Sequence, residues 1–554
     1  MTQRFLRRCS AAKHNMPLIR IVAMVGLLSA CCLEAEAQEP EEVPSRSATA
    51  EICQRLQNST VRIVSNNDRS SGVIVSLTGH ILTVAHGLHG EGRTTTIVFH
   101  DGSIAEAQIL LRDKALDVAL LKLADDSTRP TTSPISIATA GALQKTDLVL
   151  AAGYPGREPD GLPPVVRLGE LLAIGPATLR SSCTLTAGDS GGPLVNLQGQ
   201  LIGLHRKIGL SRESNHHLPV EHINDAVKSI LDFQKMQAVE ASTEGGFAAA
   251  RPRANRDVTA AIQLRTVQIF QGKSTPDPDA NAQIMATLLN SEHIATKLSE
   301  LKPNVAVHCR FHELQPCAAE IVVSDVALDL AILKLTNPHS TATSLASQPV
   351  VLATEFSVVF AASGRREPVR SEPVHFGVIT RRCHNEPPLK GKLGAVLDIE
   401  ETSRTVQVLD VAPNSTASVA GLSKTYLIDS INGQPVKTLD SVGALLSEHQ
   451  PGDWLQFQVR NAETSLTTFA RLQHDPAERF ERTEFLDGRS GIVSERRSGF
   501  AEVLQHDIEL APSDCGSPLV DSKGRVIGIN IARRARESSL AIPIEVVLQI
   551  LSRE

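Results

Sequence analysis

Short runs of apolar, often β-branched residues recur along the chain, separated by stretches of glycine and polar residues. In the first half they occupy residues 61–64, 72–76, 95–99 and 148–152. Runs of this length between turn residues are typical of β-strands, and their regular recurrence is typical of antiparallel barrels. The pattern therefore predicts a mostly β protein.

Length and composition narrow the class of protein. A chain of 554 residues is too long for one core, and we expect about three to four domains. Hydrophobic residues make up 42% and charged residues 21% of the chain, which is typical of a globular protein. The net charge of −6, with 1 Trp and 2 Tyr, supplies neither a basic surface nor stacking platforms for nucleic acid.

The N-terminus has the pattern of an export signal. Basic residues precede an apolar run at residues 21–33, and a small-x-small site follows at Ala35-Glu36-Ala37. This order predicts a signal peptide over residues 1–37 and a periplasmic or otherwise extracytoplasmic protein. Leu28-Ser29-Ala30-Cys31 resembles a lipobox, which leaves a lipid anchor on Cys31 as the alternative. Export would permit disulfides, although their connectivity cannot be deduced from sequence.

One stretch, residues 187–195, has the pattern of a nucleophile turn. It places Ser190 between glycines, which allow the positive φ values of a tight turn. Such a turn lets the amides of Gly188 and Ser190 point at a developing oxyanion. A serine needs a base and an orienting acid. His86 ends one apolar strand and Asp117 heads another, so both candidates are present.

The order His86, Asp117, Ser190 and the motifs around these residues resemble the trypsin-like serine proteases, and within them the HtrA/Deg family. The resemblance implies a chymotrypsin-like double β-barrel over residues 51–235. It also implies that Ser190 attacks the peptide carbonyl, His86 takes and returns the proton, and Asp117 fixes the imidazole tautomer.

The specificity pocket is harder to read. Thr184, six residues before Ser190, is not acidic, which disfavours cleavage after Lys or Arg. The HtrA resemblance implies small or medium apolar side chains before the scissile bond. Gly203-Leu204-His205 instead looks like a glutamyl endopeptidase motif, whose imidazole receives an acidic side chain. Both alternatives stay open.

The chain then repeats itself in a degenerate form. Residues 324–335 resemble the Asp117 strand, and residues 513–520 resemble the nucleophile turn. In this register Ser299, Asp329 and Cys515 occupy the three triad positions. No histidine stands at the base position, and a thiol without a base is mostly protonated at neutral pH. The repeat therefore predicts a pseudoprotease, with an active cysteine enzyme as the alternative.

The repeat also contains an insertion. Asp117 and Ser190 are 73 positions apart, whereas Asp329 and Cys515 are 186 apart. The surplus is long enough for a small domain, and residues 390–472 resemble a PDZ domain of α+β architecture. The resemblance implies that the amides of Leu393, Gly394 and Ala395 capture a peptide C-terminus, which adds as a strand. A PDZ fold kept only as a packing spacer is the alternative.

The resulting hypothesis is an exported serine endopeptidase of HtrA/Deg type that cleaves unfolded or damaged proteins through an acyl-enzyme. The second half of the chain would recruit substrates or regulate the enzyme. The alternative is a peptide-binding or chaperone-like scaffold with latent proteolysis. The sequence shows no P-loop and no zinc-ligand spacing, so no metal or other cofactor is expected, and a homo-oligomer is left open. The predicted units are a signal peptide (1–37), a protease domain (51–235), a linker (236–258), a degenerate unit in two parts (259–385 and 485–554) and a PDZ-like domain (390–472).

Overall fold

A computed structural model describes most of the chain from residue 48 onward. The predicted signal peptide, Cys31 and most of the predicted linker lie outside the described residues. The described residues are 48–66, 68–89, 92–124, 134–138, 143–156, 158, 161–209, 211, 213–227, 256–272, 282–311, 316–339, 343–362, 374–474 and 493–554.

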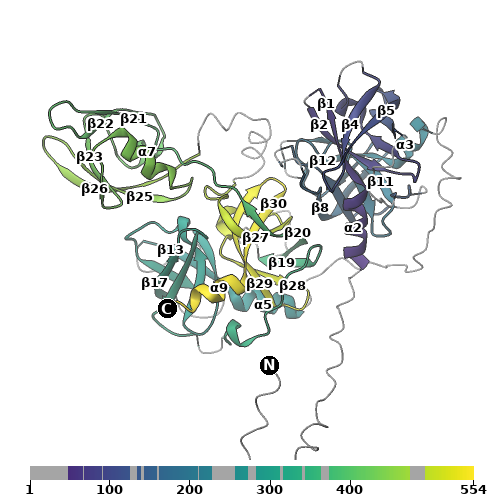
Figure 1. The fold of residues 1–554 in the computed structure, drawn as a ribbon. Coiled ribbons are helices and arrows are strands. Elements are labelled where there is room, and N and C mark those ends of the chain that lie inside the picture. Colours follow the sequence, from purple (N-terminus) through teal and green to yellow (C-terminus); the bar gives the residue numbers. More distant parts are fainter. Residues whose placement is uncertain are drawn as a thin grey trace, which may run out of the picture. The chain divides into compact units, whose positions relative to one another are not determined.

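The first half of the chain forms two closed six-stranded barrels (Figure 1). Their strand orders are β1-β2-β3-β6-β5-β4 and β10-β11-β12-β9-β8-β7. The strands of the first barrel are β1 (Thr60–Ser65), β2 (Asp68–Ile74), β3 (His80–Thr83), β4 (Thr94–Val98), β5 (Ile104–Asp113) and β6 (Val118–Leu123). Those of the second are β7 (Leu148–Gly153), β8 (Val165–Gly175), β9 (Thr178–Ser181), β10 (Pro193–Asn196), β11 (Leu201–Ile208) and β12 (Asn215–Pro219), with helices α2 (Ala48–Ser59) and α3 (Val220–Val227) outside the barrels.

Strand β6 shows how two cores share one strand. Ala119 and Leu121 pack inside the first barrel. Val118 and Leu120 belong to a second cluster with Leu150 from the second barrel. Successive side chains on a strand point to opposite faces, so a continuous apolar run is buried on both sides. The packing sets Asp117, just before β6, beside the second barrel.

The second half of the chain repeats this architecture. Its barrels have the orders β13-β14-β15-β18-β17-β16 and β19-β20-β27-β30-β29-β28, which correspond strand by strand to the first two. The strands are β13 (Thr266–Gln271), β14 (Ile284–Leu288), β15 (His293–Lys297), β16 (Val307–Arg310), β17 (Cys317–Asp325), β18 (Leu330–Leu335), β19 (Val358–Ala362), β20 (Val374–Glu386), β27 (Phe500–His506), β28 (Pro518–Asp521), β29 (Val526–Ala535) and β30 (Ser538–Pro543). Helix α5 (Arg256–Arg265) precedes this unit and extends into the segment assigned as linker, and α9 (Ile544–Leu551) ends it.

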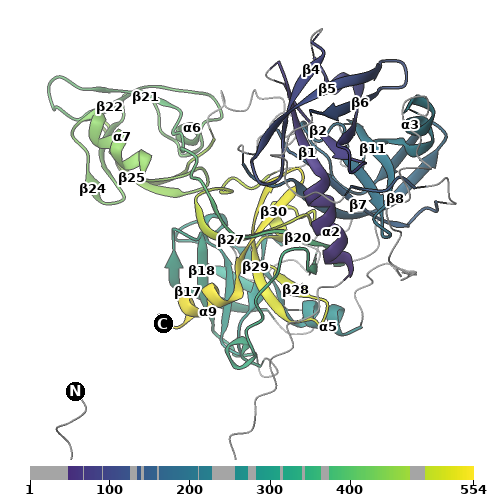
Figure 2. The ribbon, with the colours of Figure 1, turned by 45° about the vertical axis from the view of Figure 1, so that its right-hand side comes forward.

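The fourth barrel is interrupted in sequence between β20 and β27. Strands β19 and β20 belong to the same barrel as the strands that follow the interruption, and Figure 2 shows β20 beside the yellow strands of that barrel. The intervening residues form a sheet of order β21-β22-β23-β25-β26, with β24 paired to β23. Its elements are β21 (Ala395–Ile399), β22 (Val406–Val411), α6 (Thr416–Val419), β23 (Leu427–Ile431), β24 (Gln434–Pro435), α7 (Leu439–Ser447), β25 (Trp454–Arg460) and β26 (Ser465–Arg471).

The predicted fold class is confirmed: the protein is mostly β, and double barrels of chymotrypsin type account for both halves. Among the described residues, no helix has the length and apolarity needed to cross a membrane.

Candidate active site

His86 and Asp117 are brought together by local structure at the ends of two paired strands. His86 lies in a short 3₁₀ turn, Ala85–Gly87, directly after β3. Its Nδ1 atom lies 3.0 Å from each carboxylate oxygen of Asp117, and its backbone N–H donates to Asp117 Oδ1 at 3.1 Å. Asp117 has a φ of +59°, a conformation that Asp tolerates better than most residues. The carboxylate therefore holds the imidazole at two points.

Arg206 is a third member of this group, and the motif comparison did not single it out. Its Nε atom donates to Asp117 Oδ2 at 3.1 Å from strand β11. Burial alone would raise the pKa of Asp117, but the hydrogen bonds and charge of His86, with help from Arg206, lower it below its ordinary value. Asp117 is therefore ionised at neutral pH and favours the tautomer of His86 that keeps Nε2 free to accept a proton.

The turn before Ser190 is shaped by glycine. Gly188 has a φ of +96°, and an added Cβ would lie 2.4 Å from the carbonyl oxygen of Tyr154. The Gly156 amide donates to the carbonyl oxygen of Ala187 at 2.7 Å. Because the N–H and C=O of a trans peptide point in opposite directions, the Gly188 N–H points away from Gly156. We expect it to face the cleft that Gly188 and Ser190 line.

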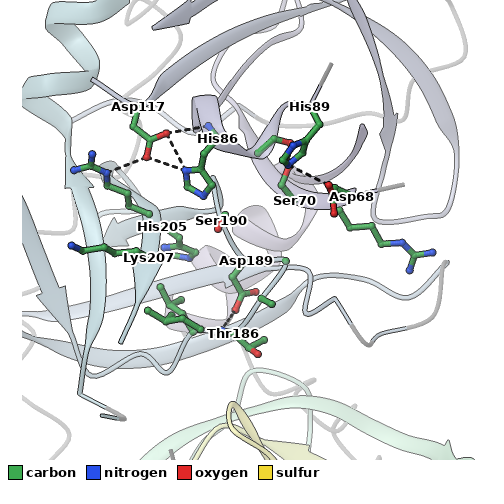
Figure 3. A pocket seen from close by; sticks show the side chains of 17 residues that line it. Asp68, Ser70, His86, His89, Asp117, Thr186, Asp189, Ser190, His205 and Lys207 are labelled. Carbon is green, nitrogen blue, oxygen red and sulfur yellow. Dashed lines mark hydrogen bonds and ion pairs between the residues drawn. The ribbon is translucent and has the colours of Figure 1, made fainter. Parts of the chain in front are cut away.

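A cleft of about 580 Å³ is lined by His86, Asp117 and Ser190 together. Figure 3 shows the His86 ring between Asp117 and Ser190. Among the described residues, Ser190 Oγ makes no hydrogen bond to the His86 ring; such bonds often form only once substrate is bound. The structure thus gathers three predicted site residues from both barrels around one cavity.

The two predicted specificity residues are placed differently. Thr184 is buried and does not line the cleft; Leu185 and Thr186 line it instead. His205 does line the cleft, and its Nδ1 lies 3.0 Å from Nδ1 of His217. His217 Nε2 in turn lies 2.8 Å from Ser181 Oγ. The sequence comparison missed His217, although its place in a run of two histidines on β12 was a signal.

His205 is buried, and its Nε2 atom has no hydrogen-bond partner among the described residues. Burial, with the nearby His217 and Arg167, holds the pKa of His205 well below its ordinary value. The ring is therefore neutral at physiological pH. It therefore brings no positive charge to the lining of the cleft.

In the second unit, Ser299 and Asp329 take the positions of His86 and Asp117. The Ser299 N–H donates to Asp329 Oδ1 at 2.6 Å, as His86 does to Asp117, and the Ser299 hydroxyl donates to Asp329 Oδ2 at 2.9 Å. The sequence comparison missed Lys297, whose buried ammonium also contacts Asp329. The signal that could have found it was a lysine two residues before Ser299, where the first unit has the apolar Val84 two residues before His86.

Cys515, at the nucleophile position, is fully buried. Burial raises the pKa of its thiol to about 11, although the charge of Lys297 opposes this. The segment from Ser494 to Phe500 covers the site: Ser494 Oγ lies 3.7 Å from Cys515 Sγ, and the Arg496 carbonyl accepts from Lys297 Nζ at 2.8 Å. A substrate backbone therefore has no open path to this thiol.

Leu393 and Gly394 directly precede β21 in the intervening sheet, and Ala395 is the first residue of that strand. Gly394 has a φ of +71°, and an added Cβ would lie 2.4 Å from Cβ of Ser415. Strand β21 pairs only with β22 and is an edge of this sheet, with α7 close to it. An edge strand beside a helix offers unpaired backbone groups to an added strand.

Metal ligation has no support in the described part of the chain, where no three His, Cys, Asp or Glu side chains are grouped to hold an ion.

The first two barrels match a known class of enzyme domain. A family profile described as a trypsin-like peptidase domain matches residues 70–204. These residues include the strands and turns that carry His86, Asp117 and Ser190. The first two barrels therefore contain a trypsin-like peptidase domain.

Individual relatives are serine proteases of similar sequence. The chain is 25% identical over 251 residues to the probable periplasmic serine protease do/HhoA-like of Haemophilus influenzae, covering 43% of this chain and 52% of the relative. It is 29% identical over 181 residues to the serine endoprotease DegS of the same organism, covering 30% and 51%. Over 399 residues it is 23% identical to the probable periplasmic serine endoprotease DegP-like of Rhizobium meliloti, covering 68% and 69%. These relatives are named as serine proteases or serine endoproteases, and the chain is similar to them.

The chain spans about half the length of the two Haemophilus relatives. A crystal structure of the serine endoprotease from Yersinia pestis overlaps 76% of this chain and 97% of its own, with 15% identity and a TM-score of 0.29. Because that score is low, the fold assignment rests on the strand orders of the barrels.

Proposed function

We propose that this protein is an exported serine endopeptidase in which Ser190, His86 and Asp117 form the catalytic triad. The observation that carries the proposal is the cleft in which Asp117 holds the His86 ring at 3.0 Å beside Ser190. Ser190 Oγ attacks the peptide carbonyl carbon while its proton passes to His86 Nε2, and His86 returns the proton to the leaving amine. Water then hydrolyses the acyl-enzyme by the same route.

The amides of Gly188 and Ser190 would hold the oxyanion during both steps. Neither amide donates to a protein acceptor among the described residues, so both are free for a substrate oxygen. A preorganised pair of donors of this kind contributes a large share of the rate in acyl transfer. The second unit would not hydrolyse peptides, since Cys515 is buried and Asp329 is occupied by Lys297.

Unfolded or damaged proteins in the periplasm are the proposed substrates. The names of the relatives from Haemophilus influenzae and Rhizobium meliloti include the word periplasmic, and the N-terminal segment has an export pattern. The sheet bearing Leu393, Gly394 and Ala395 would recruit chain ends at its β21 edge. The alternative, a scaffold with latent proteolysis, predicts peptide binding without turnover.

The decisive experiment is cleavage of an unfolded protein such as casein by the full chain, run in parallel with Ser190→Ala and Cys515→Ala. A serine-directed fluorophosphonate is used on the same samples. We expect both cleavage and labelling to disappear only with Ser190→Ala. Cleavage that survives Ser190→Ala and is lost with Cys515→Ala would instead assign the activity to the second unit.

A finer proposal concerns the pocket. Ser181 is hydrogen-bonded to His217, and His217 is hydrogen-bonded to Nδ1 of His205. Depending on the tautomers of the two rings, Nε2 of His205 is either a donor or an acceptor. We propose that His205 selects substrate side chains that form a hydrogen bond, Glu and Gln alike, over aliphatic ones. Matched chromogenic peptides ending in Glu, Gln or Leu test this, with His205→Asn as the variant. Equal or faster turnover of the Leu peptide would favour the small apolar specificity instead.

A further inference from the structure

A buried ion pair lies directly beneath the Ser190 turn. Arg167, on β8, places its Nη2 atom 3.2 Å and 3.1 Å from the two carboxylate oxygens of Asp189. Both side chains are only 1% exposed. Asp189 also accepts from the Thr186 amide at 2.8 Å. An added Cβ on Gly153 would lie 2.4 Å from Asp189 Oδ1, so the space for this carboxylate is kept by a glycine.

The Arg167–Asp189 ion pair adjoins the amides of Gly188 and Ser190, which would bind the oxyanion. Asp189 stands between Gly188 and Ser190, so the position of its side chain constrains the peptide groups on both sides. Removal of one member of a buried ion pair leaves the other charge without compensation, at a cost of several kcal/mol. Burial already raises the pKa of Asp189 to about 6, so a chain without Arg167 would either protonate Asp189 or favour a rearranged turn in which the carboxylate reaches solvent. That rearrangement would move the amides away from the substrate oxygen.

The second unit forms a hydrogen bond with strand β8, which carries Arg167. Asp507 follows β27 and is partly buried, and burial raises the pKa of its carboxyl to about 7. One of its oxygens accepts from the Leu168 amide at 2.6 Å, and the other accepts from the Val378 amide at 2.7 Å. Leu168 follows Arg167 on β8, and Val378 lies on β20. One carboxylate of the degenerate unit therefore joins β20 to the strand that carries Arg167.

Other contacts make this junction a packed one. Glu158 of the first unit accepts from Arg381 at 2.7 Å and from Arg534 at 2.8 Å, and both arginines belong to the second unit. Phe356 and Val378 of the second unit are members of the same apolar cluster as Leu150 and Val166 of the first. The two residues whose amides Asp507 accepts from, Leu168 and Val378, therefore belong to one apolar cluster that both units share.

We propose that the degenerate unit positions the oxyanion turn of the protease, acting through Asp507, strand β8 and the Arg167–Asp189 pair. The proposal rests on the proposed function, because it assigns a role in the chemistry of Ser190. Arg167 and Asp507 are positioning residues: neither lines the cleft. The loss of catalytic residues from the second unit is consistent with this role, since positioning requires its packing surface rather than a working site.

The test uses the full chain with four variants: Arg167→Met, Arg167→Met combined with Asp189→Asn, Asp507→Asn, and Glu292→Gln as the matched control. Glu292 is an acidic residue of the second unit with an exposed side chain. Each variant is measured for kcat and KM on one peptide and for its rate of fluorophosphonate labelling. Thermal unfolding shows which variants remain folded.

We expect Arg167→Met to lower kcat about 100-fold with little change in KM, the size of effect seen when an oxyanion donor is lost. The double variant removes both buried charges and should recover at least about tenfold of that loss. Asp507→Asn places an amide nitrogen against a backbone N–H and should lower kcat at least about tenfold, with KM unchanged. Glu292→Gln should match the original chain.

Three outcomes would overturn the proposal: a folded Asp507→Asn with full kcat, a folded Arg167→Met with full kcat, or a double variant no better than the single. If Asp507→Asn does not fold, the comparison of the Arg167 single and double variants still tests the pair, and Arg381→Met then tests the contribution of the second unit by another contact. If the unmodified chain neither cleaves nor labels, the proposed function fails instead. The two failures are therefore distinguishable.

Discussion

Lys297 Nζ, at the end of β15, lies 2.5 Å from Oδ2 of Asp329, which directly precedes β18, and both side chains are almost completely buried. In the first unit the equivalent carboxylate, that of Asp117, accepts from the His86 ring at the edge of an open cleft. The same turn geometry thus serves two purposes: Asp117 orients an imidazole, whereas Asp329 neutralises a buried ammonium. The second arrangement leaves the carboxylate unavailable to a base.

This pair predicts a large effect on stability. Lys297→Met should lower the free energy of unfolding by roughly 3 to 5 kcal/mol, because the Asp329 charge would remain buried without compensation. Lys334→Met removes an exposed lysine of the same unit, paired with Glu554 at 3.1 Å, and should cost less than about 1 kcal/mol. Urea unfolding of the variants measures both values, and a difference near zero between them would contradict the prediction.

The Cys515 thiol is expected to resist alkylation in the native protein. It is fully buried and its pKa is raised to about 11, so neither access nor thiolate is available at pH 8. Iodoacetamide treatment before and after denaturation, followed by peptide mapping, should show modification of Cys515 only in the denatured sample. Rapid alkylation of Cys515 in the native protein would contradict this prediction and would favour the alternative that the second unit is an active cysteine enzyme.

Asp117→Asn should lower kcat by about 10⁴-fold while leaving the fold intact, because an amide cannot hold His86 in the tautomer that accepts a proton from Ser190. Arg206→Gln, which removes only the outer partner of Asp117, should have a much smaller effect. Steady-state kinetics with thermal unfolding as a control distinguishes the two. Equal losses in both variants would mean that Asp117 acts through its ion pair with Arg206.

Glu158 predicts a pH dependence of stability. Burial opposes ionisation of this carboxyl, but the charges of Arg534 and Arg381 prevail and lower its pKa from 4.5 to about 2. A lowered pKa in the folded state contributes stability that is complete above about pH 4.5 and is lost as the pH falls toward 2. The shift corresponds to roughly 3 kcal/mol. The stability difference between the original chain and Glu158→Gln should therefore shrink from pH 6 to pH 3; a constant difference would refute this assignment.

The amino-acid sequence was enough to predict the strands and the class of protein. Each depends on short-range information: β-branched runs between turn residues, and motifs such as the one around Ser190. The correspondence between Ser299 and His86 could also be predicted from sequence, because each lies six residues after the histidine that begins the preceding strand. Such patterns depend only on residues that are close together in the sequence. The fold class predicted from them was confirmed.

Which side chains line the cleft and which residues contact one another could be learned only from the tertiary structure. Thr184 and His205 are equally prominent in sequence, yet only His205 lines the cleft. Arg167 and Asp189 are 22 positions apart, and Leu168 and Asp507 are 339 apart. No motif links such residues, because their contact depends on how the barrels close and pack. The electrostatics of a buried site are therefore set by long-range packing, which a linear pattern of residues does not contain.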